Sequence, residues 1–169
     1  MSAVVIVGNP KPASRTAHAA SLLAAALTGS APDQLIDVVD LGPGLLGWEE
    51  PKVMAAVKTA AGAGLVIVAS PTFKASYSGL LKLFLDQFAT AEGLRGVVAV
   101  PLMLGAGPAH AMAPDLLLKP VLVELGATCP APGLYLSDKT YEDGVQIGKY
   151  VQAWGGVLTD AVAGWRARR

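Results

Sequence analysis

Residues 8–16 form the first of three loops in this 169-residue chain whose side chains could build a ligand site. This first loop reads Gly-Asn-Pro-Lys-Pro-Ala-Ser-Arg-Thr, so it offers an amide, two hydroxyls and two cations directly before an expected helix. Backbone N–H groups at a helix N-terminus, together with fixed positive charge, bind phosphate groups. The glycines of a Walker A loop or a dinucleotide fingerprint are missing, which favours a terminal monophosphate held largely by side chains. The alternative is a polar loop in which Ser14 only caps the helix.

The other two loops offer surfaces against which a planar ring could lie. The second loop, residues 70–79, places an aromatic side chain, small residues and several hydroxyls after an apolar run. The third loop, residues 105–108, reads Gly-Ala-Gly-Pro. Its backbone N–H groups can approach a ligand without a side-chain clash. For the second loop, the alternative is a simple connection in which Phe73 only packs.

The segments between these loops alternate short β-branched runs with longer stretches rich in Ala and Leu. We expect strands at residues 4–7, 35–39, 65–69 and 97–104, and a fifth strand within residues 128–136. We expect helices at residues 16–27, 52–61, 79–88, 109–125 and 142–168. Prolines at positions 114 and 120 interrupt the fourth of these helices. The three loops therefore follow the first, third and fourth strands.

This alternation predicts a single doubly wound α/β domain over residues 1–169, with helices on both faces of a five-stranded parallel sheet. Two strand orders suit the length: the half-Rossmann order and the flavodoxin-like order 2-1-3-4-5. In the flavodoxin-like order, ligands lie outside the carboxyl ends of strands one, three and four. Because the three loops follow those strands, we expect the flavodoxin-like order.

Charge and hydropathy exclude several classes of function. The chain has 13 Lys and Arg against 13 Asp and Glu, so no nucleic-acid partner is expected, because neutralising a phosphate backbone needs a basic surplus. The longest uncharged run, residues 96–114, contains prolines and cannot form one apolar helix, so we expect no membrane span. No basic segment precedes the first apolar run, which predicts a cytoplasmic protein.

Few residues other than those of the loops have the chemistry for a site. The single Cys129 excludes an intramolecular disulfide and a cysteine-based zinc cluster. The two histidines belong to no metal-spaced group, so no metal is expected. Asp37 and Asp40 flank the second strand and are interpreted as solvated edge residues rather than a catalytic acid pair.

Taken together, the three loops resemble the NADPH-dependent FMN reductase family, and most closely the small flavin reductases that supply alkanesulfonate monooxygenases. The pattern Gly-x-Pro-Lys/Arg-x-x-Ser-Arg-Ser/Thr is present at residues 8–16. The pattern Pro-x-Tyr/Phe-Lys-Ala-Ser-Tyr-Ser-Gly-x-Leu-Lys, the most specific of the three, is present at residues 71–82. The pattern Gly-x-x-x-Ala-His, with Asp-x-x-Leu-Lys-Pro-Val-Leu after it, is present within residues 105–122. The likeness covers most of the chain and fades after the fifth strand.

The resemblance implies an NAD(P)H:FMN oxidoreductase that transfers a hydride from NADPH or NADH to FMN and supplies reduced flavin to a flavin-dependent monooxygenase. It implies that the FMN phosphate is bound by Asn9, Lys11, Ser14, Arg15 and Thr16. It implies that the isoalloxazine ring rests on Pro71, Thr72, Phe73, Lys74 and Ser76, with its other edge near Gly105, Ala106 and Gly107. No catalytic acid or base is expected of the protein, because the flavin carries the hydride chemistry.

Two residues depart from the family pattern. Asn9 stands where the family usually has Ser, which exchanges one hydrogen-bonding side chain for another. Leu116 stands where the sulfonate-linked reductases commonly have a Tyr on an inserted turn at the oligomer interface. From Leu116 we expect ordinary α-helical bonding over residues 112–119, an open flavin face, and FMN held at least as firmly as its product.

The sequence is compatible with alternatives to a flavin-releasing reductase. An FMN-retaining quinone, azo dye or metal reductase would share all three loops. A flavodoxin-type electron carrier is disfavoured, because such carriers are typically strongly acidic and the formal net charge here is zero. Helices 79–88 and 109–125 carry more apolar residues than one sheet face can cover, so we expect a homo-oligomer, either a dimer or a tetramer.

Overall fold

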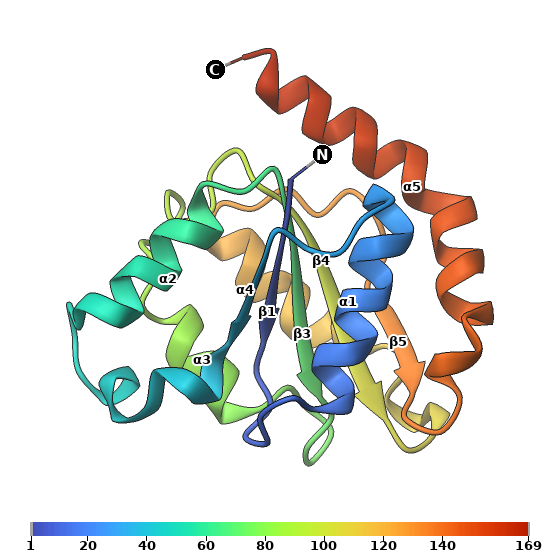
Figure 1. Ribbon diagram of the computed structural model, residues 1–169, viewed down its shortest axis with the longest axis horizontal. Helices are drawn as coiled ribbons and strands as arrows, with labels where there is room; N and C mark the ends of the chain where they lie inside the picture. Colours follow the sequence, from blue (N-terminus) through green and yellow to red (C-terminus); the bar gives the residue numbers. More distant parts are fainter. Residues whose placement is uncertain (1, 169) are drawn as a thin grey trace.

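The computed structural model describes residues 2–168 and contains one parallel sheet with the strand order β2-β1-β3-β4-β5 (Figure 1). The strands are β1 (Ala3–Val7), β2 (Gln34–Asp37), β3 (Leu65–Pro71), β4 (Val98–Gly105) and β5 (Leu134–Ser137). The α-helices are α1 (Arg15–Thr28), α2 (Pro51–Ala61), α3 (Gly79–Leu85), α4 (Lys119–Glu124) and α5 (Val145–Arg166). The predicted flavodoxin-like order is confirmed, and the half-Rossmann order does not occur.

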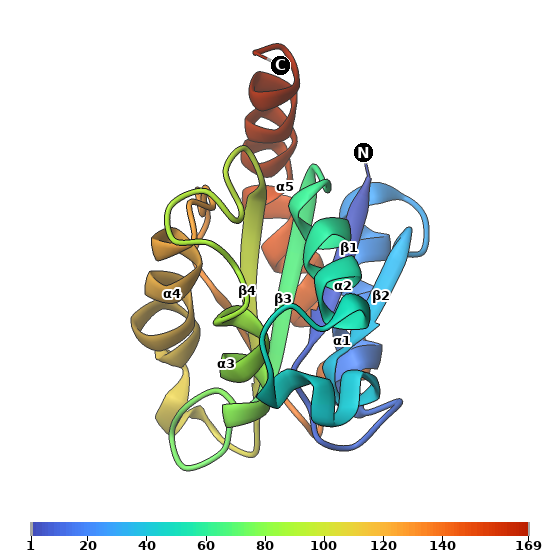
Figure 2. The ribbon, with the colours of Figure 1, turned by 90° about the vertical axis from the view of Figure 1, so that its left-hand side faces the viewer.

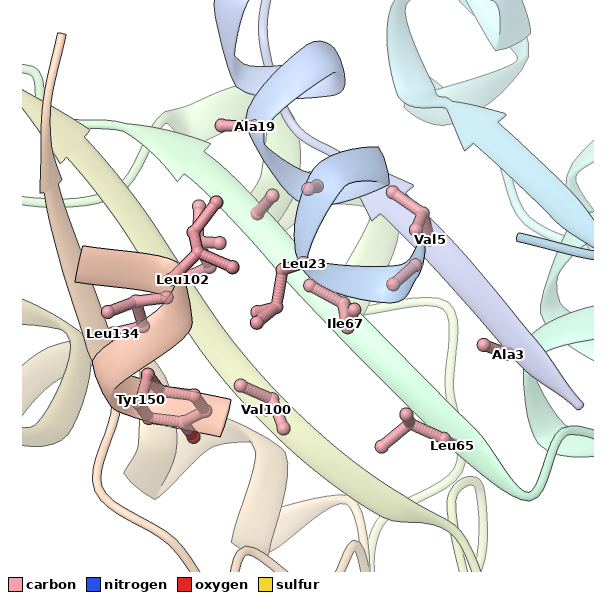
Figure 3. Packing of buried hydrophobic residues seen from close by; sticks show 14 of the residues in the cluster. Ala3, Val5, Ala19, Leu23, Leu65, Ile67, Val100, Leu102, Leu134 and Tyr150 are labelled. Atoms are coloured by element: carbon pink, nitrogen blue, oxygen red, sulfur yellow. The ribbon is translucent and has the colours of Figure 1, made fainter. Parts of the chain in front are cut away.

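The core consists of two apolar layers, one on each face of the sheet. Strands β1, β3 and β4 are buried along their whole length, as expected for parallel strands covered on both faces. Helices α1 and α5 cover one face, where Leu23 and Tyr150 pack over Ile67 and Leu102 (Figure 3). Helices α2, α3 and α4 cover the other face (Figure 2). Within residues 2–168, none of the helices has the length and apolar character needed to cross a membrane.

Local capping explains where the first helices begin and end. The Ser14 side chain accepts a hydrogen bond from the Ala17 N–H, and Gly29 closes α1 in the left-handed conformation at φ 80°. Helix α2 begins at Pro51, which suits the first turn because proline has no N–H that would need a hydrogen-bond partner. These boundaries lie within one residue of the predicted ones, because caps are encoded by neighbouring residues.

Several predicted elements are shorter than expected. Strand β2 ends at Asp37, and residues Val38–Leu46 form a 3₁₀ segment with Gly42 at φ 61°, a conformation that does not continue a strand. Helix α3 ends at Leu85, three residues before the predicted boundary. The last helix starts at Val145 rather than at residue 142, because a 3₁₀ turn precedes it and Gly144 adopts φ 71°.

The predicted 109–125 helix is divided into three parts. A 3₁₀ turn at Pro108–His110 is followed by a π-helical turn at Pro114–Leu118, and α4 comes after it. In the π-turn the Lys119 N–H bonds to the carbonyl of Pro114, five residues earlier. The expectation of ordinary α-helical bonding through Leu116 is therefore wrong.

Contacts outside the helix account for the π-turn. The Asp115 carboxylate accepts the Gly133 N–H at 3.0 Å and the Lys119 ammonium at 3.3 Å, and Lys119 also donates to the Ala131 carbonyl at 2.9 Å. These bonds tie the turn to the segment before β5. Pro120 has no N–H to donate, so the α-helical arrangement offers one bond fewer at this point. The π-turn, which has one residue more than an α-helical turn, is therefore formed here with Leu116 in its middle.

Gly8, directly after β1, lies against Leu81 of α3, so a substitution there tests how closely the two segments pack. A methyl group at Gly8 would overlap the Cβ of Leu81. We expect Gly8→Ala to lower the free energy of unfolding by about 1–3 kcal/mol, because the overlap forces a backbone shift in a packed region. Urea denaturation followed by circular dichroism measures this change.

The matched control for this packing is Gly79→Ala at the start of α3. An added Cβ at Gly79 meets nothing within 4 Å, and Ala is favoured over Gly in a helix, so stability stays the same or rises. Equal stability of Gly8→Ala and the wild type would contradict the packing described.

Candidate functional site

A cavity of about 500 Å³, the first cavity, opens at the carboxyl ends of the strands. These strand ends lie at the lower edge of the ribbon in Figure 1. It lies between the first, second and third loops and has the size typical of a small-molecule site. Of the residues predicted from the sequence, it is lined by Asn9, Lys11, Ser14, Arg15, Thr16, Pro71, Thr72, Phe73, Gly105 and Ala106. The loops predicted to meet at this edge do so.

Three predicted residues lie outside the first cavity. Lys74 is in a tight hairpin turn, and the backbone of Ser76, at the end of that turn, makes two hydrogen bonds with Phe73, of 2.8 and 3.1 Å. Both Lys74 and the next residue, Ala75, have left-handed backbone conformations, at φ 49° and 70°. Gly107 lines a neighbouring space of about 550 Å³, the second cavity. The second cavity shares Thr72, Gly105 and Ala106 with the first and is bounded by the Pro108–His110 turn.

Side chains within the first loop hold its shape. The Asn9 amide donates to the Thr16 hydroxyl at 3.0 Å, and its carbonyl accepts the Lys11 N–H at 2.9 Å. Ser14 and Thr16 are buried, at 5% and 2% exposure, and Ser14 caps α1. Asn9 and Thr16 thus shape the loop as well as line the cavity. The positive end of the α1 dipole faces the same space.

Asp37 supports the first loop from behind. Its carboxylate accepts the Ala13 N–H at 3.2 Å, where Ala13 has a left-handed backbone conformation at φ 49°. Asp37 is only 9% exposed, and burial raises the pKa of its carboxyl group, while the bond from Ala13 acts in the opposite direction. The interpretation of Asp37 as a solvated edge residue is wrong, because the first loop folds over the end of β2.

The charged residues of the first cavity are of both signs. Lys11 and Arg15 bring two cations to it, and Arg15 is 64% exposed. The Arg15 guanidinium donates to the Asp138 carbonyl at 3.1 Å and lies 3.5 Å from the Asp138 carboxylate. Sequence reasoning missed Asp138, which directly follows β5 and lines the first cavity. The strand order was the available signal, since β5 neighbours β4 and ends at the same edge.

The wall between the two cavities combines a buried hydroxyl with glycine backbone. The Thr72 hydroxyl is buried and has no hydrogen-bond partner among residues 2–168. A Cβ at Gly105 would overlap the Tyr135 hydroxyl and lie 3.2 Å from the Thr72 hydroxyl, so a larger residue there would displace the Tyr135 side chain. Tyr135 in turn donates to the Gly107 carbonyl at 2.7 Å. Thr72 and Gly105 therefore pack closely against Tyr135 where the two cavities meet.

The remaining reactive side chains lie outside the first cavity. Burial raises the pKa of the Cys129 thiol to about 11, so it is not a thiolate nucleophile at neutral pH. His110 lines the second cavity. Within residues 2–168, no three His, Cys, Asp or Glu side chains are grouped closely enough to hold a metal ion. The site is suited to bind an anionic group at one end and a planar, partly apolar group at the other.

Comparison with known proteins relates this geometry to a family. Residues 1–142 match the model of the NADPH-dependent FMN reductase family. An FMN reductase (NADPH) of Pseudomonas putida is 33% identical over 117 residues, which are 68% of this chain and 59% of that protein. An FMN reductase (NADPH) of Escherichia coli is 42% identical over 78 residues, which are 46% of this chain and 40% of that protein. The chain thus spans about half the length of these curated relatives.

A solved structure matches over a larger share of the fold. The crystal structure of an NADH:FMN oxidoreductase (EMOB) in its apo form aligns with a TM-score of 0.76 at 32% identity. The alignment covers 99% of this chain and 89% of that one. With the family model matched over residues 1–142 and the three loops meeting at one edge of the sheet, the chain belongs to the NADPH-dependent FMN reductase family.

Proposed function

We propose that this protein is an NAD(P)H-dependent FMN reductase, which takes a hydride from NADPH or NADH and transfers it to FMN. The observation that carries the proposal is the first cavity, where the cationic first loop and the ring-sized surface of the second and third loops meet. The family assignment and the relatives named FMN reductase support the same activity. The proposal includes a cytoplasmic location, where NADH and NADPH are available.

The residues of the first cavity fit the two ends of FMN. The phosphate would be bound by Asn9, Lys11, Ser14, Arg15 and Thr16, beside the N-terminus of α1. The ring would lie against Pro71, Thr72, Phe73, Gly105 and Ala106. Thr72 also lines the second cavity, so it lies where the ring end of the first cavity meets the neighbouring space. Lys74 and Ser76 order the hairpin that carries Phe73.

The second cavity gives the hydride donor a place beside the ring. It shares Thr72 and Gly105 with the first cavity, and Gly107 and His110 extend it away from the first loop. When bound, FMN supplies the hydride-accepting chemistry itself. The contribution of the protein is to bind and orient the two partners, and no side chain is assigned as an acid or base.

We propose further that reduced FMN leaves for a flavin-dependent monooxygenase. The expectation of firm FMN retention assumed an ordinary α-helix at Leu116, and the π-turn removes that assumption. Such turns are frequently functional, which favours release over the alternative of an FMN-retaining quinone, azo dye or metal reductase. The formal net charge of zero disfavours a flavodoxin-type carrier.

Steady-state oxidation of NADPH and NADH, with and without added FMN, tests the activity. We expect oxidation to rise with added FMN until saturation, and the protein to emerge colourless from gel filtration. A yellow protein that oxidises NAD(P)H without added FMN would support the FMN-retaining alternative. No FMN-dependent oxidation of either nucleotide would contradict the proposed function.

Arg15→Ala tests the assignment of the phosphate end. We expect FMN to bind about threefold to tenfold more weakly, because a charge-assisted contact is lost from a side chain that solvent partly screens. Riboflavin, which has no phosphate, should bind as it does to the wild type. Fluorescence titration of both flavins measures the two affinities.

The matched control for Arg15 is Arg95→Ala. Arg95 is 67% exposed and paired with Glu92, but it lies outside the first cavity. This variant removes the same charge and should leave FMN affinity unchanged. Unchanged FMN affinity in Arg15→Ala as well would refute the phosphate assignment of the first loop.

We also propose that the protein forms a homo-oligomer, a dimer or tetramer, through α3, the π-turn and α4. The support is a set of exposed apolar side chains on these segments and on the turn before the π-turn: Leu83, Met112, Leu116, Leu117 and Val123. Leu116, at 65% exposure, has the largest exposed fraction among them. Covering such residues is favourable in proportion to the apolar area removed from water.

Leu116→Glu tests this interface. We expect light scattering to give a multiple of the chain mass for the wild type and the mass of one chain for the variant, because a buried unpaired carboxylate opposes association. Val157→Glu on α5 is the control, since Val157 is 42% exposed on the opposite layer. A wild-type protein with the mass of a single chain would rule out the oligomer.

A further inference from the structure

Asp138 places a negative charge in a cavity whose other charged residues are suited to bind an anion. It directly follows β5 and lines the first cavity together with Lys11 and Arg15. Its backbone N–H donates to the Gly105 carbonyl at 3.0 Å, which fixes the residue against the end of β4. The main chain therefore places Asp138 at the edge of the first cavity.

The surroundings of the Asp138 carboxylate compensate its charge incompletely. One oxygen lies 3.5 Å from the Arg15 guanidinium. The other oxygen is buried and has no hydrogen-bond partner in the part of the chain that the structure describes. Arg15 also donates to the Asp138 carbonyl at 3.1 Å, so the guanidinium is anchored by the backbone independently of the carboxylate. The carboxylate therefore pairs with the guanidinium, but the bond to the Asp138 carbonyl also holds the guanidinium in place.

We propose that Asp138 competes with the flavin phosphate for Arg15 and thereby determines how strongly the site prefers FMN over riboflavin. This inference rests on the proposed function, since it concerns the same first cavity. Without ligand, the guanidinium is partly neutralised by Asp138. An entering phosphate must share that guanidinium with a like charge nearby, so it gains less than it would from a free arginine.

The competition has a direct effect on flavin exchange. The main effect falls on the phosphate end of the ligand, because the charged group that Asp138 pairs with is Arg15. A flavin with a phosphate is still preferred, through Lys11 and the N-terminus of α1. The lower affinity for the phosphate favours dissociation of the flavin from the site. Asp138 is therefore a specificity-determining residue rather than a catalytic one.

Asp138→Asn removes the negative charge and keeps a side chain of nearly the same shape. The carbonyl contact to Arg15 and the bond to Gly105 involve the backbone and remain. We expect FMN to bind at least about threefold more tightly, because a competing ion pair is removed. The affinity for riboflavin should change by less than about twofold, since the removed interaction acts on the phosphate. Fluorescence titration of both flavins gives the ratio that tests the proposal.

The same substitution in the Arg15→Ala background tests whether the effect passes through Arg15. If Asp138 competes for the guanidinium, the gain in FMN affinity shrinks when the guanidinium is absent. An equal gain with and without Arg15 would overturn the competition. A loss of FMN affinity in Asp138→Asn would also overturn it, because Asp138 would then be positioning Arg15 for the phosphate.

Two further variants keep the test decisive. Asp143→Asn removes an equal charge nearby but outside the first cavity, and its side-chain oxygen can still accept the Val145 N–H, so FMN affinity should not change. Asp138→Ser repeats the charge removal with a smaller side chain if the Asn variant folds poorly. A wild-type protein that binds no FMN would overturn the proposed function together with this inference. FMN binding with an unchanged FMN-to-riboflavin ratio in both Asp138 variants would overturn the inference alone.

Discussion

The arrangement of the site depends on two buried serines that join its loops. The Ser78 hydroxyl donates to the Gly8 carbonyl and accepts the Leu81 N–H, and the Ser78 N–H donates to the Ser70 hydroxyl. Ser70 is fully buried and Ser78 is 4% exposed, so breaking any of these bonds would leave a polar group unpaired away from water. The Ser78–Gly8 bond joins the end of the second loop to the start of the first, and the other two bonds hold Ser78 in place for it.

The sequence is informative wherever structure depends on neighbouring residues. Ser14 and Gly29 mark the ends of α1 because capping involves groups within one turn. Continuous apolar runs mark the central strands, and the loops that follow them indicate the strand order. The residues proposed for FMN binding come from the resemblance to the family, whose patterns match contiguous loops that each lead from a strand to the next helix.

Pairings between distant segments could not be predicted in this way. Asp37 has the pattern of a solvated strand end, and only the fold of the first loop buries it. Asp115 looks like an ordinary helix residue, yet its bond to Gly133 stabilises a π-turn that no local pattern encodes. Asp138 belongs to no motif, and its role depends on Arg15, 123 positions earlier in the chain.

The hairpin that carries Phe73 has a consequence for the energetics of binding. Lys74 and Ala75 are both held in left-handed conformations that cost residues other than glycine about 1–2 kcal/mol each. The backbone pairing of Phe73 with Ser76 offsets this cost when the protein folds. The paired hairpin therefore lowers the free energy that a ligand entering the first cavity would lose to the ordering of this loop. Phe73, 48% exposed, is preorganised, and the protein can bind and exchange its ligand repeatedly without refolding the surface that recognises it.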